Sequence, residues 1–337
     1  MAVNNSTILD RCKLEGTWEY QQRVPSATQS GVAQVADFLF DPLNKMYLNQ
    51  FVDILVNRIG MTRILGRTWD NPWSRMKKGN LPYGSTVQEI GAKWLKAHSY
   101  EDDIESLLKL HRPELEAAYY TINRRDQYDI SIVYDEVRNA FTDEYGLNSL
   151  INQVTDVPIS SDNYDEFLCM KNLILERYAR DGFYKHEITV TGMSKKEIAQ
   201  EILEAARMYA EKMKFPSIVY NMVEIPAFIK DSDELIFVTT PETNAIMDVS
   251  ALAAAFNMQK SEIPYSNEII DEWPMVADGD IAGIVTTKDF FQVYDALYTT
   301  TSFYNPQTLA TNYYLTHWQV MAYSPFVPAV MIVTKSS

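Results

Sequence analysis

The sequence predicts an α+β fold, and two features of the chain indicate it. Residues 296–334 contain no Asp, Glu, Lys or Arg, although charged residues make up 22% of the chain. In their place are many tyrosines, threonines and valines, which favour strands covered on both faces. Earlier segments instead combine helix-capping residues with apolar residues at helical spacing. A chain of 337 residues is long enough for one elaborated domain or two.

Composition and charge exclude several classes of protein. The net charge of −15 argues against an autonomous binder of duplex DNA, which normally needs a basic face. Cys12 and Cys169 are too few and too far apart for a disulfide framework or a metal site. Asp10 and Arg11 lie where a signal peptide would need an apolar run, so we expect synthesis in the cytosol. The C-terminal segment is too polar to cross a bilayer, and no membrane partner is expected.

Residues 1–40 are predicted to be an N-terminal arm. They are polar and irregular, with residues 25–31 as a flexible centre. Trp18, Tyr20 and Phe38 favour an arm that docks on a neighbouring subunit, with a disordered tail as the alternative. Either interpretation predicts that the rest of the chain folds without this segment.

A first helix is predicted within residues 41–62. Asp41 is a suitable N-cap, Pro42 suits the first helical position, and Gly60 marks the end. The predicted apolar face consists of Leu43, Tyr47, Phe51, Ile54 and Leu55.

Residues 63–130 are predicted to form a long charged hairpin with strands at 86–94 and 118–125. The segment holds a basic run and an acidic cluster, which we predict to meet as an intersubunit charge contact. Solvated faces are the alternative for either run, and nucleic-acid binding is a further alternative for the basic one. The candidate contact residues are Arg63, Arg67, Arg75, Lys77, Lys78, Glu101, Asp102, Asp103 and Glu105.

Residues 131–190 are predicted to contain short helical pieces ending near Pro158, followed by a long helix capped by Asp162. Gly182 lies beyond the predicted end of that helix. Its predicted apolar stripe consists of Tyr164, Phe167, Leu168, Ile174, Leu175 and Tyr178.

Residues 191–304 suit a compact α+β subdomain. Ser194 and Glu197 form a capping box, and the buried face of the helix they start is predicted to hold Ile198, Ile202, Ala205 and Tyr209. Strands are predicted at 186–191, 235–239 and 281–286, and helices from Thr240 and at 250–258. In residues 305–337, two final strands joined at Ser324-Pro325 are predicted to return to the first core.

No catalytic, cofactor-binding or metal-binding motif is present, so the chain is not predicted to be an enzyme. His98, His111, His186 and His317 match neither HExxH nor a Cys/His zinc spacing. Residues 79–84 form a turn without phosphate-binding spacing, and no G-x-S-x-G motif occurs.

Several segments carry a resemblance to a known family. They are residues 248–258, 288–297, 305–306 and 312–319, with a fainter match at 56–60, 71–72 and 77–86. In order and content these segments resemble the major capsid proteins of small short-tailed phages, the phi29 relatives. The resemblance covers most of the chain from about residue 45 onward.

The resemblance implies a Hong Kong 97-like capsid fold. Its parts would be an N-terminal arm (1–40), a peripheral domain (41–62 and 131–190, with the long helix as spine helix), an extension loop (63–130), an axial domain (191–304) and C-terminal strands (305–337). It also implies a structural protein that self-assembles into hexamers and pentamers, forming the icosahedral shell of a phage head. The expected location is the virion capsid, and no cofactor is expected.

The resemblance further implies a scaffolding protein and a portal as partners, with double-stranded DNA confined rather than gripped by the shell. Two other functions stay open from the residues themselves. One is an acidic-site hydrolase such as a glycosidase, using tyrosines and tryptophans as sugar platforms. The other is an encapsulin-like shell that stores cargo instead of DNA.

Overall fold

The computed structural model describes residues 4–55, 68–82, 84–97, 99, 112–142, 146–230, 234–245, 247, 266–273 and 279–335, without the side chains of 148, 149 and 151–155. The chain forms two compact units. Unit 1 comprises Met1–Pro72, Asn123–Leu168 and Asp295–Gln319, and unit 2 comprises Trp73–Ile122, Cys169–Tyr294 and Val320–Ser337. Within the described ranges, no helix combines the length and apolar character needed to span a membrane.

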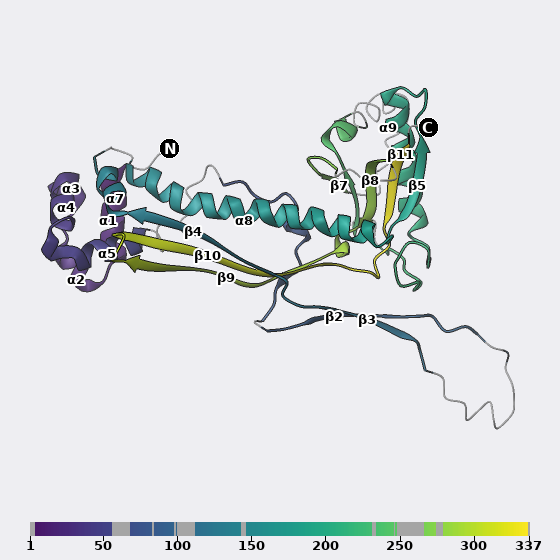
Figure 1. Ribbon diagram of the computed structural model, residues 1–337, viewed down its shortest axis with the longest axis horizontal. Helices are drawn as coiled ribbons and strands as arrows, with labels where there is room; N and C mark the ends of the chain where they lie inside the picture. The colour runs from purple at the N-terminus through teal and green to yellow at the C-terminus, as the bar shows by residue number, and fades with distance from the viewer. Residues whose placement is uncertain are drawn as a thin grey trace. The chain divides into compact units, whose positions relative to one another are not determined.

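The N-terminal segment of unit 1 is helical, so the prediction that residues 1–40 are irregular is wrong. Its helices are α1 (Asn5–Glu15), α2 (Trp18–Arg23), α3 (Ala27–Ser30) and α4 (Val32–Leu39) (Figure 1). Each is too short to show a clear helical period, and such helices form only when tertiary packing supports them. Their apolar side chains share one core with later elements, and its members include Ile8, Leu9, Cys12, Tyr20, Val35, Leu39, Phe51, Phe141, Leu147 and Tyr313.

The segment predicted as the flexible centre of the arm contains α3, and Asp10 of α1 holds its start. The Asp10 carboxylate accepts hydrogen bonds from the Ser26 hydroxyl (2.9 Å) and from the backbone N–H groups of Ala27 (2.7 Å) and Thr28 (3.0 Å). It thereby satisfies amides at the helix N-terminus that would otherwise have no intrahelical partner. Burial alone would raise the pKa of Asp10, but its hydrogen bonds from Thr28 and Ser26 outweigh burial and lower it.

The first predicted helix is confirmed in part. Asp41 accepts a hydrogen bond from the Leu43 N–H (2.9 Å) and starts the 3₁₀ turn η1 (Pro42–Asn44), which leads into α5 (Lys45–Ile54). Leu43, placed on the apolar face by its spacing, is 91% exposed because it lies in the 3₁₀ turn rather than in α5. Gly60 lies outside the described residues. The four remaining residues of the predicted face are buried: Tyr47, Phe51, Ile54 and Leu55.

A sheet and a long helix lie mainly in unit 1, with residues 79–80, 169–179, 291–294 and 320–323 of these elements in unit 2. The sheet has the strand order β1-β9-β10-β4, with β10 antiparallel to β4 from the pair Ala310↔Val133 to the pair Gln319↔Arg124. Figure 1 shows α8 running along β4 and β10. The strands are β1 (Gly79–Asn80), β4 (Arg124–Val133), β9 (Phe291–Asn305) and β10 (Ala310–Tyr323), and the helices are α7 (Tyr134–Ala140) and α8 (Gly146–Ala179).

Two predictions about the segment that forms helix α8 are wrong. The helical pieces do not end near Pro158, because Pro158 lies inside α8 and lacks only the one N–H that the helix would otherwise use. Asp162 is not an N-cap: it is inside the helix, 2% exposed, and bonded to Arg124 and His317. Local sequence suggested a cap because Asp competes for backbone amides, but here tertiary partners take its carboxylate.

The predicted apolar stripe of α8 is also partly confirmed. Phe167 and Ile174 are buried, whereas Tyr164 is 50% exposed. The helix ends as predicted just before Gly182, whose N–H bonds to the Arg177 carbonyl at 2.9 Å. Arg177, which the stripe did not include, is fully buried and donates to the backbone carbonyls of Gly182, Ser324 and Val327.

Unit 2 contains a five-stranded sheet of order β5-β11-β8-β6-β7, with α9 (Lys195–Lys212) packed on it. The predicted capping box is confirmed, since Ser194 N–H donates to Glu197 (2.7 Å) and Glu197 N–H donates to the Ser194 hydroxyl (3.3 Å). Residues 250–258, predicted to be helical, lie outside the described residues. The strands are β5 (Tyr184–Thr189), β6 (Leu235–Thr239), β7 (Ser266–Ile269), β8 (Asp280–Thr287) and β11 (Val330–Lys335).

The sequence predicted that both final strands return to the first core, and this prediction is wrong for one of them. β10 pairs with β4 in unit 1, but β11 lies between β5 and β8 in unit 2. Both strands are apolar enough to be buried anywhere, so their composition could not decide which sheet each would join.

Unit 2 also contains a two-stranded sheet of β2 (Val87–Ala92) and β3 (Leu115–Tyr120), which pair antiparallel. The predicted strand at 118–125 is wrong in its bounds, because β3 ends at Tyr120 and the separate strand β4 begins at Arg124. Two 3₁₀ turns, η3 (Ser74–Met76) and η5 (Lys288–Phe290), also belong to this unit.

Candidate functional site

The described part of the predicted basic run lies in unit 2 and is engaged within the chain. Arg75 forms an ion pair with Glu268, whose side chain is 2% exposed, and Lys78 forms one with Asp289. Lys77 lies between them, just after η3. The six remaining candidates lie outside the described residues, so the intersubunit charge contact stays a prediction: Arg63, Arg67, Glu101, Asp102, Asp103 and Glu105.

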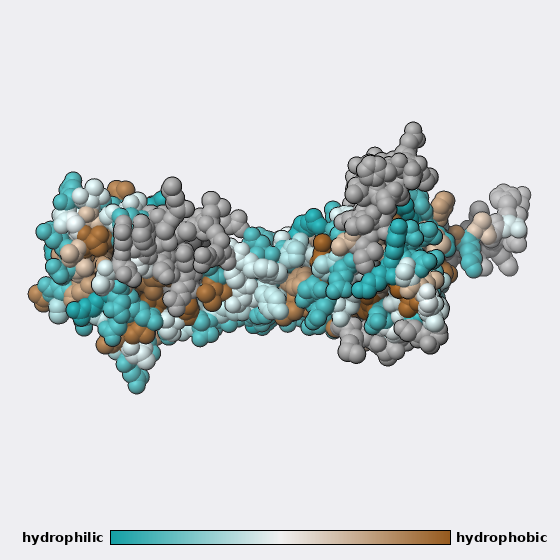
Figure 2. Space-filling view, turned by 90° about the horizontal axis from the view of Figure 1, so that it is seen from above, coloured by the Kyte–Doolittle hydropathy of each residue, from teal (hydrophilic) through white to brown (hydrophobic). Residues whose placement is uncertain are grey.

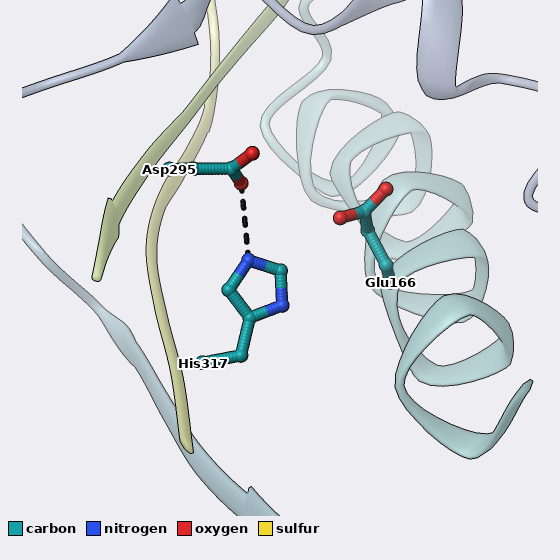
Figure 3. A group of neighbouring side chains, drawn as sticks. All are labelled: Glu166, Asp295 and His317. Carbon is teal, nitrogen blue, oxygen red and sulfur yellow. Dashed lines mark hydrogen bonds and ion pairs between the residues drawn. The ribbon is translucent and has the colours of Figure 1, made fainter. Parts of the chain in front are cut away.

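A buried group of polar side chains lies in unit 1, between α8 and the strands. It consists of Arg124 on β4, Asp162 and Glu166 on α8, Asp295 on β9, and His317 and Gln319 on β10, which we call the His317 cluster. Three of its members are drawn in Figure 3. All are buried except Asp295, whose side chain is 22% exposed.

Regular geometry brings these side chains together. Alternate residues of a strand face the same side, so Leu315, His317 and Gln319 all point to the covered face of β10. The register places Arg124 opposite Gln319 on β4. Asp162 and Glu166 are four residues apart in α8 and therefore lie on one helical face. The local sequences thus direct two groups of polar side chains into one layer.

His317 joins two carboxylates. Its Nδ1 lies 2.8 Å from both oxygens of Asp162, and its Nε2 lies 3.1 Å from Oδ1 of Asp295. Since carboxylates only accept hydrogen bonds, both ring nitrogens must donate, and the ring is an imidazolium. Burial alone would lower the pKa of His317, but the hydrogen bonds to Asp162 and Asp295 outweigh burial and raise it.

Gln319 links the remaining carboxylate, Glu166, to Asp295. Its Nε2 donates to Oε2 of Glu166 and to Oδ1 of Asp295, each at 2.6 Å. Asn71 Nδ2 donates to the other oxygen of Glu166 at 2.8 Å. The Gln319 carbonyl oxygen accepts a hydrogen bond from Arg124. One amide side chain therefore holds a cation on one side and two anions on the other.

Arg124 completes the cluster as its second cation. It donates from Nη2 to Asp162 Oδ1 (2.8 Å) and to the Tyr128 hydroxyl (2.9 Å), and from Nε to Asp126 (2.6 Å). Burial opposes the charged form, but Asp126 and Asp162 outweigh it and raise the pKa of Arg124. Hydrogen-bonded networks of this kind are costly to disturb, because any member left without its partner is a buried polar group without compensation.

Sequence reasoning considered His317 and set it aside, because its partners lie 155 residues and 22 residues away in the chain. Spacing rules detect ligands that are close in sequence, and the carboxylate nearest to His317 along the chain, Asp295, is 22 residues away. One signal was available in the sequence. His317 and Gln319 are polar residues at alternate positions of a strand, on a face whose other buried side chains include the apolar Leu315.

Comparison with known proteins identifies the family. A family model described as the Phi29-like phage major capsid protein matches residues 12–333. The chain belongs to the phi29-like phage major capsid proteins.

Individual members of this phi29-like family and known capsid structures agree with the assignment. The chain is 29% identical over 331 residues to the major capsid protein of Bacillus phage B103, covering 97% of this chain and 72% of that one. It is 28% identical over 314 residues to that of Bacillus phage GA-1, covering 92% of this chain and 66% of that one. The fold is similar to a chain in the capsid structure of Staphylococcus phage Andhra (TM-score 0.63, 14% identity), covering 80% of this chain and 86% of that one.

A phi29-like capsid protein is a structural component of the virion and assembles with other subunits into a shell. The proteins that this chain resembles are structural rather than enzymatic. The His317 cluster is consistent with a structural role, since each of its carboxylates accepts hydrogen bonds from protein donors.

Proposed function

We propose that this chain builds a phage head from hexamers and pentamers of itself, with the Hong Kong 97 capsid fold, around double-stranded DNA. The observation that carries the proposal, beyond the family match, is an apolar face of the β2–β3 hairpin that its own chain leaves exposed. Such a face needs a cover, and in a shell the neighbouring subunit supplies it.

The strand register places that face in detail. Ile90 pairs with Ala117, Ala92 with Leu115, and Gln88 with Tyr119, so these six side chains point to one side. Ile90 is 57% exposed, Leu115 61% and Tyr119 65%. An isolated two-stranded hairpin is marginally stable in water, and this one leaves its larger apolar side chains in solvent.

The opposite face of the hairpin is attached to the rest of unit 2. Ser324 donates a hydrogen bond to Glu89 at 2.8 Å, and the Tyr120 hydroxyl donates to the same carboxylate at 2.7 Å. Gly91 packs so closely that a Cβ there would lie 2.7 Å from Ile225 and 2.8 Å from Phe326. Attachment on one face orients the apolar face outward, as an intersubunit contact requires.

Other exposed apolar residues support several contacts per subunit. They occur on the N-terminal helices, where Figure 2 shows hydrophobic surface, and in the segment after α9. Interfaces are enriched in large apolar and aromatic side chains of this kind. In these two segments they are Leu14, Trp18, Leu43 and Met46 in unit 1, and Phe215, Ile218, Val219 and Phe228 in unit 2.

In the Hong Kong 97 terms of this proposal, α8 is the spine helix of the peripheral domain and the β2–β3 hairpin belongs to the extension loop. The sheet of unit 2 with α9 is the core of the axial domain. Residues 1–40 stay the N-terminal arm, now as a group of helices. The similarity to the Andhra capsid fold supports this correspondence.

The charge of −15 supports confinement of DNA rather than tight binding, because an acidic inner surface repels phosphates. A scaffolding protein and a portal are the further partners we propose. For the charged contact of the extension loop, changing Glu101, Asp102, Asp103 and Glu105 to lysine is expected to impair assembly. Shells of unchanged yield would remove that contact from the proposal.

Electron microscopy and sedimentation of the purified chain test the assembly. We expect capsomers or shells from the parent chain, and discrete folded subunits from a variant with Ile90→Ser and Leu115→Ser. Gln88→Ser, on the same face but replacing one polar side chain with another, is the matched control and should assemble normally. A double variant that assembles like the parent would show that the hairpin face is not a contact.

The same preparations address the two alternatives. Shells that package DNA in infected cells favour a phage head, and shells holding only protein cargo would favour an encapsulin-like store. A glycosidase is not favoured by the cluster geometry, since Asp162, Glu166 and Asp295 accept hydrogen bonds from protein groups, and Asp162 and Glu166 are buried out of reach of a sugar.

A further inference from the structure

We propose that Glu166, Asp295 and His317 bind one divalent metal ion of the zinc type inside unit 1. The site is independent of the proposed assembly mechanism, because all of its residues belong to unit 1 of the same chain. Its three potential ligand atoms, one imidazole nitrogen and two carboxylate oxygens, all lie within 4.8 Å of one another.

The donor set suits zinc. Zinc accepts His nitrogen and carboxylate oxygen at about 2.0–2.2 Å, with three protein ligands and one further position. Two ligands of a tetrahedral ion are about 3.4 Å apart by the same distances, so small side-chain rotations would bring the present atoms into place. Figure 3 shows the carboxylate of Asp295 and the ring of His317 on the strands, with Glu166 facing them from α8.

His317 already has the orientation of a metal ligand. Histidine ligands usually donate their other ring N–H to a carboxylate, which fixes the ring and raises its basicity. Here Nδ1 lies 2.8 Å from both oxygens of Asp162, and Nε2 points to Asp295. Asp162 would thus keep its hydrogen bond when the ion replaces the proton on Nε2.

The carboxylates of Glu166 and Asp295 are held close together, as two ligands of one cation must be. Glu166 and Asp295 both accept a hydrogen bond from the same nitrogen, Gln319 Nε2, at 2.6 Å. Two like charges at such short range attract a cation. Asn71 holds the other oxygen of Glu166, so the carboxylate position is fixed from both sides.

The site also has a route of entry and a structural consequence. Asp295 is 22% exposed on its side chain, whereas Glu166 and His317 are buried, so an ion would enter along Asp295. The ligands come from α8, β9 and β10, which are far apart in sequence. A bound ion would therefore crosslink three elements of unit 1 and stabilise them by linkage.

Zinc titration of the full chain by calorimetry, together with elemental analysis after dialysis, tests the proposal. We expect one zinc per chain, and a melting temperature about 5–10 °C higher when free zinc is 100 times its dissociation constant. Asp295→Asn, which keeps the size of the side chain at the exposed edge, should weaken binding at least tenfold, and His317→Gln should abolish it. Asp162→Asn should weaken it about 10–100-fold.

A matched control is His186→Gln, because His186 lies in unit 2 and its Nδ1 is hydrogen-bonded to the Tyr209 hydroxyl at 3.1 Å. This variant should bind zinc like the parent. Circular dichroism shows whether each variant is folded, and Asp295→Asn serves if His317→Gln is not. Absence of a stoichiometric zinc in the parent, or equal zinc binding by folded Asp295→Asn, would overturn the proposal.

Discussion

Two antiparallel strand pairs of this protein have opposite distributions of polarity. In β4–β10, the face covered by α8 carries Arg124, His317 and Gln319. In β2–β3, the face left in solvent carries Ile90, Leu115 and Tyr119. Each pair thus departs from the usual arrangement at one face: β4–β10 buries polar residues beside the apolar Leu315, and β2–β3 leaves apolar residues in solvent.

The buried polar face of β4–β10 and the exposed apolar face of β2–β3 have different physical consequences. A buried polar layer is stable only when its members find partners, and those of the His317 cluster do so within one subunit. An exposed apolar face is satisfied only by another surface. In this chain, a buried polar face therefore specifies the fold, whereas an exposed apolar face specifies association.

The largest expected effect concerns the core of unit 1, which the N-terminal helices share with the sheet. Deleting residues 1–40 removes buried side chains such as Leu9, Tyr20 and Leu39, each worth about 1.5–3 kcal/mol. Their sum approaches the whole stability of a domain, about 5–15 kcal/mol. We therefore expect an unfolded or insoluble product, opposite to the expectation from sequence alone, as measured by circular dichroism and proteolysis.

A pair of leucines on α1 provides a graded version of that deletion. Leu9→Ala, at a site 4% exposed, should cost about 2–5 kcal/mol, and Leu14→Ala, at a site 76% exposed, about 0.5 kcal/mol or less. A truncated chain that melts like the parent would show that the helices are dispensable after all.

Breaking the buried polar layer should have the next largest effect. Arg124→Met leaves Asp162 without this cation, and removing one partner of a buried pair costs about 3–5 kcal/mol. The neighbouring Arg125 is the control, because it lies on the exposed face and stacks over Trp318 at 5.1 Å. Arg125→Met should cost about 1 kcal/mol or less in urea unfolding. Equal losses would refute the structural role of the layer.

The attachment of the hairpin can be disturbed from its inner face. Gly91→Ala places a methyl group against Ile225 and Phe326, and such overpacking costs about 1–3 kcal/mol. Ala92→Ser, one residue further and on the exposed face, should change the free energy of unfolding by about 0.5 kcal/mol or less. If both variants unfold at the same urea concentration, the close approach of Gly91 does not matter for stability.

Acid should weaken the N-terminal helices through Asp10. Its folded-state pKa is lowered, so its contribution to stability is complete above the unfolded value, about 3.9, and is lost as the pH falls through the folded value. Asp10→Asn should cost about 1 kcal/mol at pH 7, where the charged acceptor is lost. The difference between the two proteins in urea unfolding should shrink below about pH 4. A difference independent of pH would exclude the carboxylate as its cause.

The smallest effect on stability is expected for the exposed hairpin face. Ile90→Ser and Leu115→Ser should each change the free energy of unfolding by about 0.5 kcal/mol or less, because neither side chain is buried in the subunit. Their effect on assembly should nevertheless be complete. A large loss of subunit stability instead would mean that the face is covered within the chain.

Several elements were determined by the sequence itself, because their signals are local. The Ser194–Glu197 capping box starts α9, Asp41 starts the first turn, and apolar β-formers predicted β6 and β8. In each case the residues that decide the element lie within one turn of helix or one strand. The family resemblance likewise came from short segments in the right order.

Only the tertiary structure decided the remaining features, because they depend on partners far away in the chain. Short N-terminal helices form against a core supplied by α5 and α7, and Asp162 serves in a buried network instead of a cap. The His317 cluster collects residues from four elements. Hydrogen bonding and burial stabilise such groups only after the strands are in register, so no spacing along the chain could reveal them.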